Sequence, residues 1–187
     1  MAQRAALFLD RDGVINVDRA YVHRPQDFDF IEGIFDLCRN ARQHDYLVFV
    51  VTNQAGIARG FYTEDDFLQL TRWMCGEFER RGAIIDKVYF CPFHAEHGIG
   101  PYKRDSPLRK PAPGMILQAA QEFDVDLGGS VLVGDMETDI QAGIGAGVGI
   151  NLLFRPLAHA QAEATAATRQ IDRLADVCAY LKRRPRS

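Results

Sequence analysis

The sequence predicts an α/β fold in which helices cover both faces of a doubly wound, mainly parallel sheet. Short apolar runs alternate with longer segments of helical period, which favours parallel strands joined by right-handed crossovers. One run, Tyr46 to Val51, is continuously β-branched and aromatic, as expected of a strand buried on both faces. The 187 residues, of which 47% are hydrophobic, suit one domain spanning residues 1–187, and no linker divides them.

The first half of the chain contains three predicted strands and two predicted helices. Apolar runs predict strands at 5–9, 46–51 and 87–90. The first helix is indicated by apolar residues that share one helical face: Ile34, Leu37, Cys38 and Ala41. Thr63 and Asp66 have the spacing of a capping box, so a second helix is expected to begin there. It continues through apolar residues at helical spacing: Phe67, Leu70, Met74 and Phe78.

The second half of the chain continues the alternation. Pro113 suits the first turn of a helix that carries Ile116, Ala119, Ala120 and Phe123. Strands are predicted at 130–133 and 149–153, with a glycine-punctuated helix at 138–146 between them. A terminal helix is indicated by Leu174, Val177, Cys178 and Leu181. The alanine-rich stretch 159–168 fits either a loop or a helix.

Composition and charge narrow the class of protein. The net charge of −3 and the pI of about 5.9, without a run of like charges, argue against nucleic acid or a membrane surface as a partner. The early apolar run 5–9 is too short for a signal peptide or a membrane span, so a cytoplasmic protein is expected. The four cysteines form no Cys-x-x-Cys pair and are interpreted as reduced thiols: Cys38, Cys75, Cys91 and Cys178.

Three predicted strands end at residues that can do chemistry. Asp10 and Asp12 follow the first strand, Thr52 and Asn53 follow the second, and Asp135 follows the fourth. Ligands of such sheets bind at the carboxyl ends of the strands, so these residues are expected to converge there. Carboxylates held close repel one another unless a proton or cation intervenes, and Mg²⁺ prefers oxygen ligands. The Asp10–Asp12 pair alone would equally fit a turn; with Asp135, a magnesium site is the better interpretation.

Two further segments carry donors suited to a phosphoryl group. The run from Thr52 to Gly56 offers a hydroxyl, two side-chain amides and a permissive glycine, although the same run would also fit a turn and a helix cap. Arg109 and Lys110 stand between prolines directly before a predicted helix, whose free N–H groups also favour anions. These segments are candidates for phosphate contacts.

Four ordered motifs resemble those of the haloacid dehalogenase (HAD) superfamily of phosphotransferases. They are Asp10-Arg11-Asp12-Gly13, Thr52-Asn53-Gln54, Arg109-Lys110-Pro111 and Gly134-Asp135-x-x-x-Asp139. Two longer segments, 16–23 and 52–60, are similar to those of the D-glycero-D-manno-heptose-1,7-bisphosphate 7-phosphatases, whose relatives include the histidinol-phosphate phosphatases. The resemblance implies a Rossmann-like core without a large cap domain, and a Mg²⁺-dependent phosphomonoesterase. It implies removal of the 7-phosphate to give heptose 1-phosphate, in nucleotide-activated heptose biosynthesis for lipopolysaccharide or capsule.

The resemblance also implies a role for each motif residue. Asp10 is expected to attack phosphorus and form an aspartyl phosphate, while Asp12 acts first as general acid and then as general base. Thr52 and Lys110 are expected to stabilise the transferring phosphoryl group. Magnesium would be held by Asp10, the main-chain carbonyl of Asp12, and Asp135. The implied substrate contacts are Asp18, Arg19, Tyr21, Asn53, Gln54 and Arg109.

One loop departs from the family's pattern. Many members hold a structural zinc with Cys-x-His and a later Cys-x-Cys pair, but here Phe93 follows Cys91 at the histidine position, and Ser106 and Leu108 occupy the two later cysteine positions. A zinc site requires four ligands, so zinc is predicted to be absent. Packing of Phe93 and Leu108 is expected to replace it.

Several alternatives stay open on the sequence. A receiver domain also combines an acidic cluster, Thr and Lys on a doubly wound sheet, but the second aspartate two residues after the first suits a phosphatase. Histidinol phosphate is the alternative substrate; Arg19, Arg59 and Arg109 better suit the second phosphate of a small sugar bisphosphate. The anomer and the oligomeric state are open, with a monomer favoured.

Overall fold

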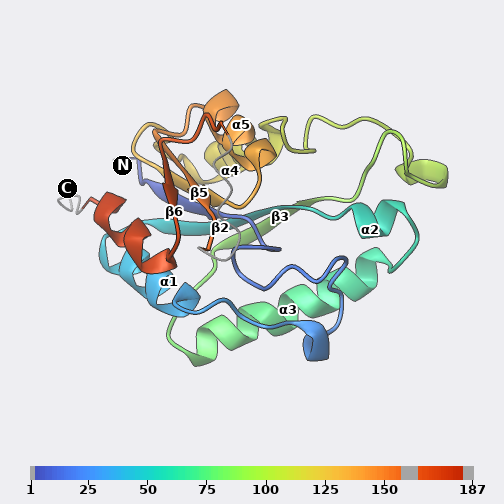
Figure 1. The fold of residues 1–187 in the computed structure, drawn as a ribbon, viewed down its shortest axis with the longest axis horizontal. Helices are drawn as coiled ribbons and strands as arrows, with labels where there is room; N and C mark the ends of the chain where they lie inside the picture. Colours follow the sequence, from blue (N-terminus) through green and yellow to red (C-terminus); the bar gives the residue numbers. More distant parts are fainter. Residues whose placement is uncertain (1–2, 157–163, 183–187) are drawn as a thin grey trace.

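The computed structural model describes residues 3–156 and 164–182, and its centre is a six-stranded sheet. The strand order is β3-β2-β1-β4-β5-β6, and every neighbouring pair is parallel (Figure 1). The strands are β1 (Ala6–Leu9), β2 (Leu47–Asn53), β3 (Lys87–Cys91), β4 (Val131–Gly134), β5 (Ile150–Phe154) and β6 (Arg169–Ile171). The predicted doubly wound parallel sheet is confirmed.

Helices cover both faces of the sheet (Figure 1). One face packs against α1 (Ile34–Gln43), α3 (Glu64–Arg80) and the 3₁₀ helix η4 (Leu174–Tyr180). The other face packs against α4 (Gly114–Phe123) and α5 (Glu137–Ala146). Shorter helical turns lie in the connections: η1 (Pro25–Asp27), α2 (Ala55–Ala58) and η2 (Gly100–Tyr102).

Alternation along the buried strands divides the core into two layers. In β1, Leu7 and Leu9 join the layer beneath α1 and α3, whereas Ala6 and Phe8 join the layer beneath α4. All four side chains are fully buried because successive strand residues point to opposite faces and both faces are covered. The central strand is therefore rigidly packed, which fixes the position of the residues that follow it.

Most predicted elements agree with the structure, but one strand was missed and one helix differs in type. The capping box is present, since Thr63 Oγ1 accepts from the Asp66 N–H and the Asp66 carboxylate accepts from the Thr63 N–H. The edge strand β6 was not predicted, because three residues with two exposed side chains carry no apolar pattern. The expected terminal helix is the 3₁₀ helix η4. Part of the alanine-rich stretch, 159–163, lies outside the described residues, and 164–168 are not helical.

No helix in the described part of the chain is long and apolar enough to cross a membrane.

Candidate active site

The three motif-bearing strands lie side by side at the centre of the sheet. β1 stands between β2 and β4, so the direction of the strand order changes at β1. In open α/β sheets a crevice forms at the carboxyl ends of the strands at such a point. Asp10 follows β1, Thr52 and Asn53 end β2, and Asp135 follows β4. The predicted convergence of these residues is a direct result of the strand order.

A buried cluster of three carboxylates and one ammonium group forms the centre of the site. One carboxylate oxygen from each of Asp10, Asp135 and Asp139 lies within 4.8 Å of the other two. Lys110 Nζ lies 2.9 Å from Asp10 Oδ1, 2.6 Å from Asp139 Oδ1 and 2.8 Å from the carbonyl oxygen of Val51. The sequence placed Asp139 in a motif without a role, and the structure makes it the second partner of Lys110.

The electrostatics of this cluster favour a bound cation. Burial, followed by repulsion from Asp139, raises the pKa of Asp135 to about 7. Burial also raises the pKa of Asp10, although Lys110 opposes the rise. Burial alone would lower the pKa of Lys110, but the facing carboxylates of Asp10 and Asp139 outweigh it and raise that pKa. One ammonium group therefore faces three acidic groups, and the cluster lacks positive charge. A divalent cation can supply that charge.

The residues of the cluster fit magnesium. Asp135 Oδ1 is buried and has no hydrogen-bond partner among the described residues. Gly13 has φ +86°, and a Cβ there would lie 2.2 Å from Asp135 Oδ2. The absence of a side chain at Gly13 thus lets the loop after β1 approach Asp135 closely. Mg²⁺ is commonly bound by one or two such carboxylates together with waters and substrate phosphate.

Asp12 lies outside the carboxylate cluster. Its two oxygens each accept from Arg11 Nη2 at 2.8 Å, and Asn16 Nδ2 donates to Oδ1 at 3.0 Å. Arg11 is only 1% exposed and also donates from Nη2 to the carbonyl oxygen of Val22. The two motif aspartates are thereby separated: Asp10 faces Lys110 and Asp12 faces Arg11.

Asn53 and Gln54, two of the predicted substrate contacts, both make hydrogen bonds within the protein. Asn53 Oδ1 accepts from the Lys110 N–H and Asn53 Nδ2 donates to the Lys110 carbonyl oxygen, both at 3.0 Å. This pair of bonds holds the main chain of Lys110 against the end of β2. Gln54 Nε2 donates to Thr52 Oγ1 at 2.8 Å and to Asp12 Oδ2 at 3.3 Å.

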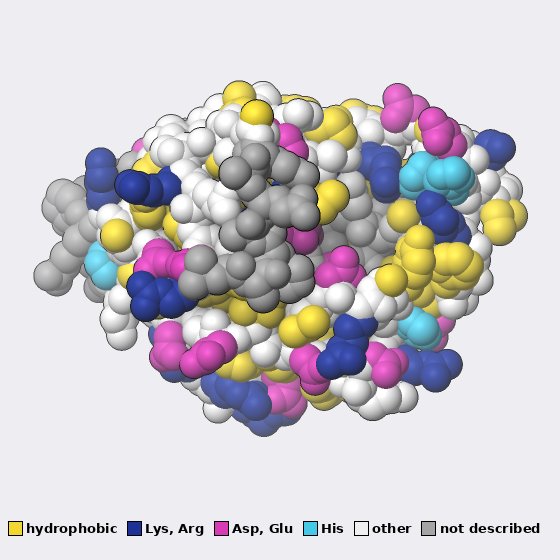
Figure 2. All heavy atoms as spheres, viewed as in Figure 1, with side chains coloured by type: hydrophobic (Ala, Val, Ile, Leu, Met, Phe, Trp, Pro, Cys, Tyr) yellow, Lys and Arg dark blue, Asp and Glu magenta, His cyan; other side chains and the backbone are white. Residues whose placement is uncertain are grey.

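The loop after β1 carries three of the predicted substrate contacts. Asp18 Oδ1 accepts from the Ala20 N–H, and Arg19 pairs with Asp29 at the surface. Tyr21 packs edge-on against Phe61, with ring centroids 4.6 Å apart. Phe61 follows α2 and is 54% exposed. At the end of the molecule where α2 lies, on the right in Figure 2, hydrophobic, histidine and charged side chains gather.

Arg109 lines a cavity together with Lys110 and His94. Its Nη1 donates to the carbonyl oxygen of Phe93 at 3.1 Å. Burial lowers the pKa of Arg109, and the nearby charge of Arg59 lowers it further. Arg59 stacks over the Tyr21 ring at 5.9 Å, and its buried Nε has no hydrogen-bond partner in the described part of the chain. The positive charge of Arg59 thus acts on Arg109.

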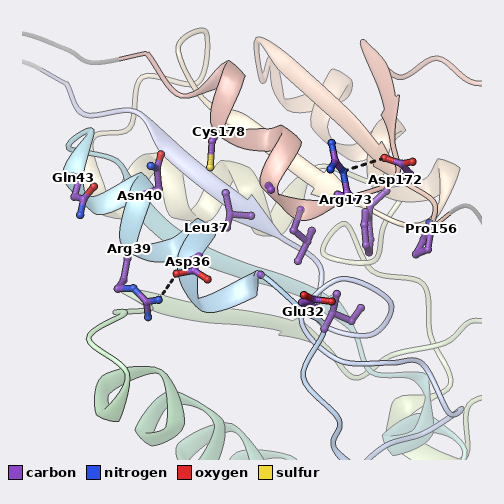
Figure 3. Close-up of a pocket in the computed structure, with 15 residues that line it drawn as sticks. Glu32, Asp36, Leu37, Arg39, Asn40, Gln43, Pro156, Asp172, Arg173 and Cys178 are labelled. Carbon is purple, nitrogen blue, oxygen red and sulfur yellow. Dashed lines mark hydrogen bonds and ion pairs between the residues drawn. The ribbon is translucent and has the colours of Figure 1, made fainter.

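A separate cavity of about 720 Å³ lies between α1 and η4 and contains none of the predicted site residues. Figure 3 shows Asp36 paired with Arg39 and Arg173 with Asp172 along its walls. Four of the charged residues that line the cavity are thus paired with one another.

The fold and the motif residues together define a phosphotransferase of the HAD superfamily, and a family model described as HAD-hydrolase-like matches residues 107–177. The chain is 57% identical to the D-glycero-alpha-D-manno-heptose-1,7-bisphosphate 7-phosphatase of Burkholderia mallei over 94% of this chain and 93% of that protein. It is 48% identical to the corresponding beta-anomer enzyme of Vibrio cholerae, over 96% and 97% of the two chains. The chain belongs to the heptose-1,7-bisphosphate 7-phosphatase family.

A solved structure agrees with this membership. The D,D-heptose 1,7-bisphosphate phosphatase of B. bronchiseptica, complexed with magnesium and phosphate, superposes with a TM-score of 0.79 at 32% identity. The match covers 95% of this chain and 97% of that one. The predicted fold class and family resemblance are confirmed.

Proposed function

We propose that this protein is a Mg²⁺-dependent phosphatase that removes the 7-phosphate of D-glycero-D-manno-heptose 1,7-bisphosphate through an aspartyl-phosphate intermediate. The observation that carries the mechanism is the separation of the two motif aspartates. Asp10 lies in the acidic cluster beside Lys110, whereas Asp12 is held by Arg11 and Asn16. One carboxylate is thus available as nucleophile and the other for proton transfer.

The contacts of Asp10 select its nucleophilic oxygen. Oδ1 accepts from the Arg11 N–H at 2.7 Å and lies 2.9 Å from Lys110 Nζ. The other oxygen, Oδ2, is therefore the one we assign to attack phosphorus. The charge of Lys110 favours the ionised form of Asp10. The same ammonium group and the Thr52 hydroxyl stabilise the phosphoryl oxygens. Asp12 gives its proton to the leaving sugar oxygen and then takes one from the water that cleaves the aspartyl phosphate.

Magnesium would be held by the carboxylates of Asp10 and Asp135 and by the main-chain carbonyl of Asp12. When bound, it neutralises charge that develops on the transferring phosphoryl group. Asp139 is occupied by Lys110 and by the N–H of Met136, at 2.9 Å. We therefore assign Asp139 to orienting Lys110.

The second phosphate of the substrate is assigned to Arg59 and Arg109. Guanidinium groups bind phosphate oxygens in bidentate geometry. The buried Nε of Arg59 has no acceptor among the described residues, so it can donate to a phosphate oxygen. Arg19 already pairs with Asp29, so it contributes less to this assignment. Asp18 and Tyr21, on the loop after β1, remain our candidates for sugar contacts.

The loop between Cys91 and Leu108, which holds zinc in many family members, is proposed to fold here without zinc. Phe93 and Leu108 both pack against the core layer beneath α4, and the Arg104 guanidinium lies 3.8 Å above the Phe93 ring. We propose that these packing contacts hold the loop in place, as the zinc ligands do in other members of the family. Elemental analysis of the purified protein should find less than about 0.1 zinc per chain, since four ligands are required; stoichiometric zinc would refute the assignment.

We further propose a single catalytic domain, a cytoplasmic monomer, and a role in nucleotide-activated heptose biosynthesis for lipopolysaccharide or capsule. The sequence has a net charge of −3 and no long run of basic residues. This charge supports a small-molecule substrate over nucleic acid or a membrane surface. Size-exclusion chromatography with light scattering tests the monomer.

The deciding experiment measures phosphate release with Mg²⁺ from both anomers of heptose 1,7-bisphosphate and from histidinol phosphate. Both anomers are needed because the relatives' names include both. We expect preference for a heptose bisphosphate, abolished in Asp10→Asn. Preference for histidinol phosphate would keep the chemistry and overturn the substrate. A stable phosphorylated protein without turnover would instead favour a receiver-type role.

A further inference from the structure

Tyr62 is a buried site residue that the sequence does not single out. It is 6% exposed and lies on the loop between α2 and α3. Gly56 makes room for the ring, because a Cβ there would lie 2.2 Å from Tyr62 Cε1. On another side, the imidazole of His23 stacks on the ring with centroids 5.1 Å apart and planes 9° from parallel. The chain thus provides a closely fitted slot for this one side chain.

The Tyr62 hydroxyl completes a hydrogen-bonded chain that ends at two catalytic groups. It donates to Gln54 Oε1 at 2.6 Å. The Gln54 amide nitrogen then donates to Thr52 Oγ1 at 2.8 Å and to Asp12 Oδ2 at 3.3 Å. Gln54 is 1% exposed, so water is not at hand to replace a lost partner.

The partners at both ends leave the Gln54 amide one favourable orientation. Both oxygens of Asp12 accept from Arg11 Nη2, so the side of the Gln54 amide that donates to Asp12 is the NH₂ group. The carbonyl oxygen then faces Tyr62, which donates to it. Because Thr52 Oγ1 accepts from Gln54, the proton of the Thr52 hydroxyl is free to point at an acceptor in the crevice. A phosphoryl oxygen is such an acceptor.

We propose that Tyr62 is a positioning residue for phosphoryl transfer: through Gln54, its hydroxyl aims the Thr52 hydroxyl at the phosphoryl group and holds Asp12 in place. The inference rests on the function proposed above and assigns to it a residue that touches neither substrate nor metal. Without the Tyr62 hydroxyl, Gln54 Oε1 loses its buried donor, and the amide turns or shifts to find another. Thr52 and Asp12 then lose a shared donor together.

Tyr62→Phe tests the proposal because it removes one oxygen and keeps the ring in its slot. We expect kcat to fall about 10- to 100-fold, the range caused by small misplacements of catalytic groups. KM should change less than about threefold, since the lost interaction acts mainly on the reacting atoms. The matched control is Tyr46→Phe, which removes a buried hydroxyl at the amino end of β2 that donates to the Gly129 carbonyl oxygen. The control should keep wild-type kcat.

A double-mutant comparison tests whether the Tyr62 hydroxyl acts through Gln54 or only stabilises the fold. In a Gln54→Met background, Tyr62→Phe should cause no further fall in kcat, because the hydroxyl acts through Gln54. A full and independent fall in that background, or an unchanged kcat in the single variant, would overturn the proposal.

A readout that needs no substrate distinguishes failure of this inference from failure of the proposed function. The ¹⁵N resonance of the Gln54 side-chain amide, assigned by its loss in Gln54→Met, should shift and exchange with water about tenfold faster in Tyr62→Phe, but not in Tyr46→Phe, because a buried hydrogen bond is lost. An unchanged resonance would overturn the inference. Absence of heptose bisphosphate turnover by the wild type would overturn the proposed function alone.

Discussion

Lys110→Met is the most informative single perturbation of the acidic cluster. The ammonium group is buried and contacts both Asp10 and Asp139, at 2.9 and 2.6 Å. Removing one partner of a buried ion pair typically costs about 3–5 kcal/mol, because the other charge is left uncompensated. For a domain of this size, each kcal/mol lowers Tm by about 2–4 °C, so the metal-free variant should melt about 6–20 °C below the wild type.

The loss should grow as the pH rises. Lys110 lowers the pKa of Asp10, so its removal leaves that carboxyl with a still higher folded pKa. A folded pKa above the unfolded value means that the native state binds more protons, and stability then falls with rising pH. We therefore expect a smaller difference from wild type at about pH 5 than at about pH 8, both above the unfolded Asp pKa of about 3.9.

Differential scanning calorimetry in EDTA and in saturating Mg²⁺ provides the assay. At 100 times Kd, a bound ion contributes about 2.7 kcal/mol, and the more negative site of the variant should bind Mg²⁺ more tightly, giving a larger Tm rise than in the wild type. The control is Lys87→Met, an exposed pair with Glu122 that should cost less than about 1 kcal/mol. A metal-free Lys110→Met protein as stable as Lys87→Met would refute the reasoning.

Three further predictions concern the nucleophile, the apoprotein and a helix cap. Asp10→Asn should lower kcat by more than about 10⁴-fold in the phosphate-release assay, as loss of a nucleophile does, while an intact thermal transition shows that folding is retained. The pKa of Asp135 is raised to about 7, so the metal-free wild type should lose stability as pH rises towards that value; saturating Mg²⁺ should remove much of this slope in urea titrations at several pH values. Thr63→Ala removes the side-chain cap of α3 and should cost about 1 kcal/mol in urea unfolding, with kcat unchanged.

The sequence predicts the fold well where period and capping carry the signal. The five longer strands are all found, each with its bounds shifted by at most two residues, because continuous apolar runs mark strands buried on both faces. β6 escapes because its pairing with β5 is made by main-chain groups, and two of its three side chains face solvent. Strand order also brings the predicted Asp10, Thr52 and Asp135 to one edge of the sheet.

The hydrogen-bond partners within the site follow no sequence rule. The family resemblance implies that Asn53 and Gln54 contact the substrate. The structure adds that Asn53 clamps the main chain of Lys110 and that Gln54 joins Thr52 to Asp12. Neither role can be deduced from spacing, since it depends on the loop that brings Lys110 across to β2. The sequence also gives no sign of the slot for Tyr62. Only the structure shows that Gly56 makes room for a ring six residues later in the chain.

In the proposed mechanism the two motif aspartates have different functions, and the chain gives each a different buried cation. They stand two residues apart, and the same motif supplies Arg11, which turns to Asp12, while Lys110 comes from a distant loop to Asp10. Environments that divide paired carboxylates in this way are how one site runs nucleophilic and proton-transfer chemistry together. Arg11 is therefore more than a spacer: its burial over Phe67, with the ring centroid 5.7 Å away, fixes Asp12 on the side of the crevice where Gln54 and Thr52 also lie.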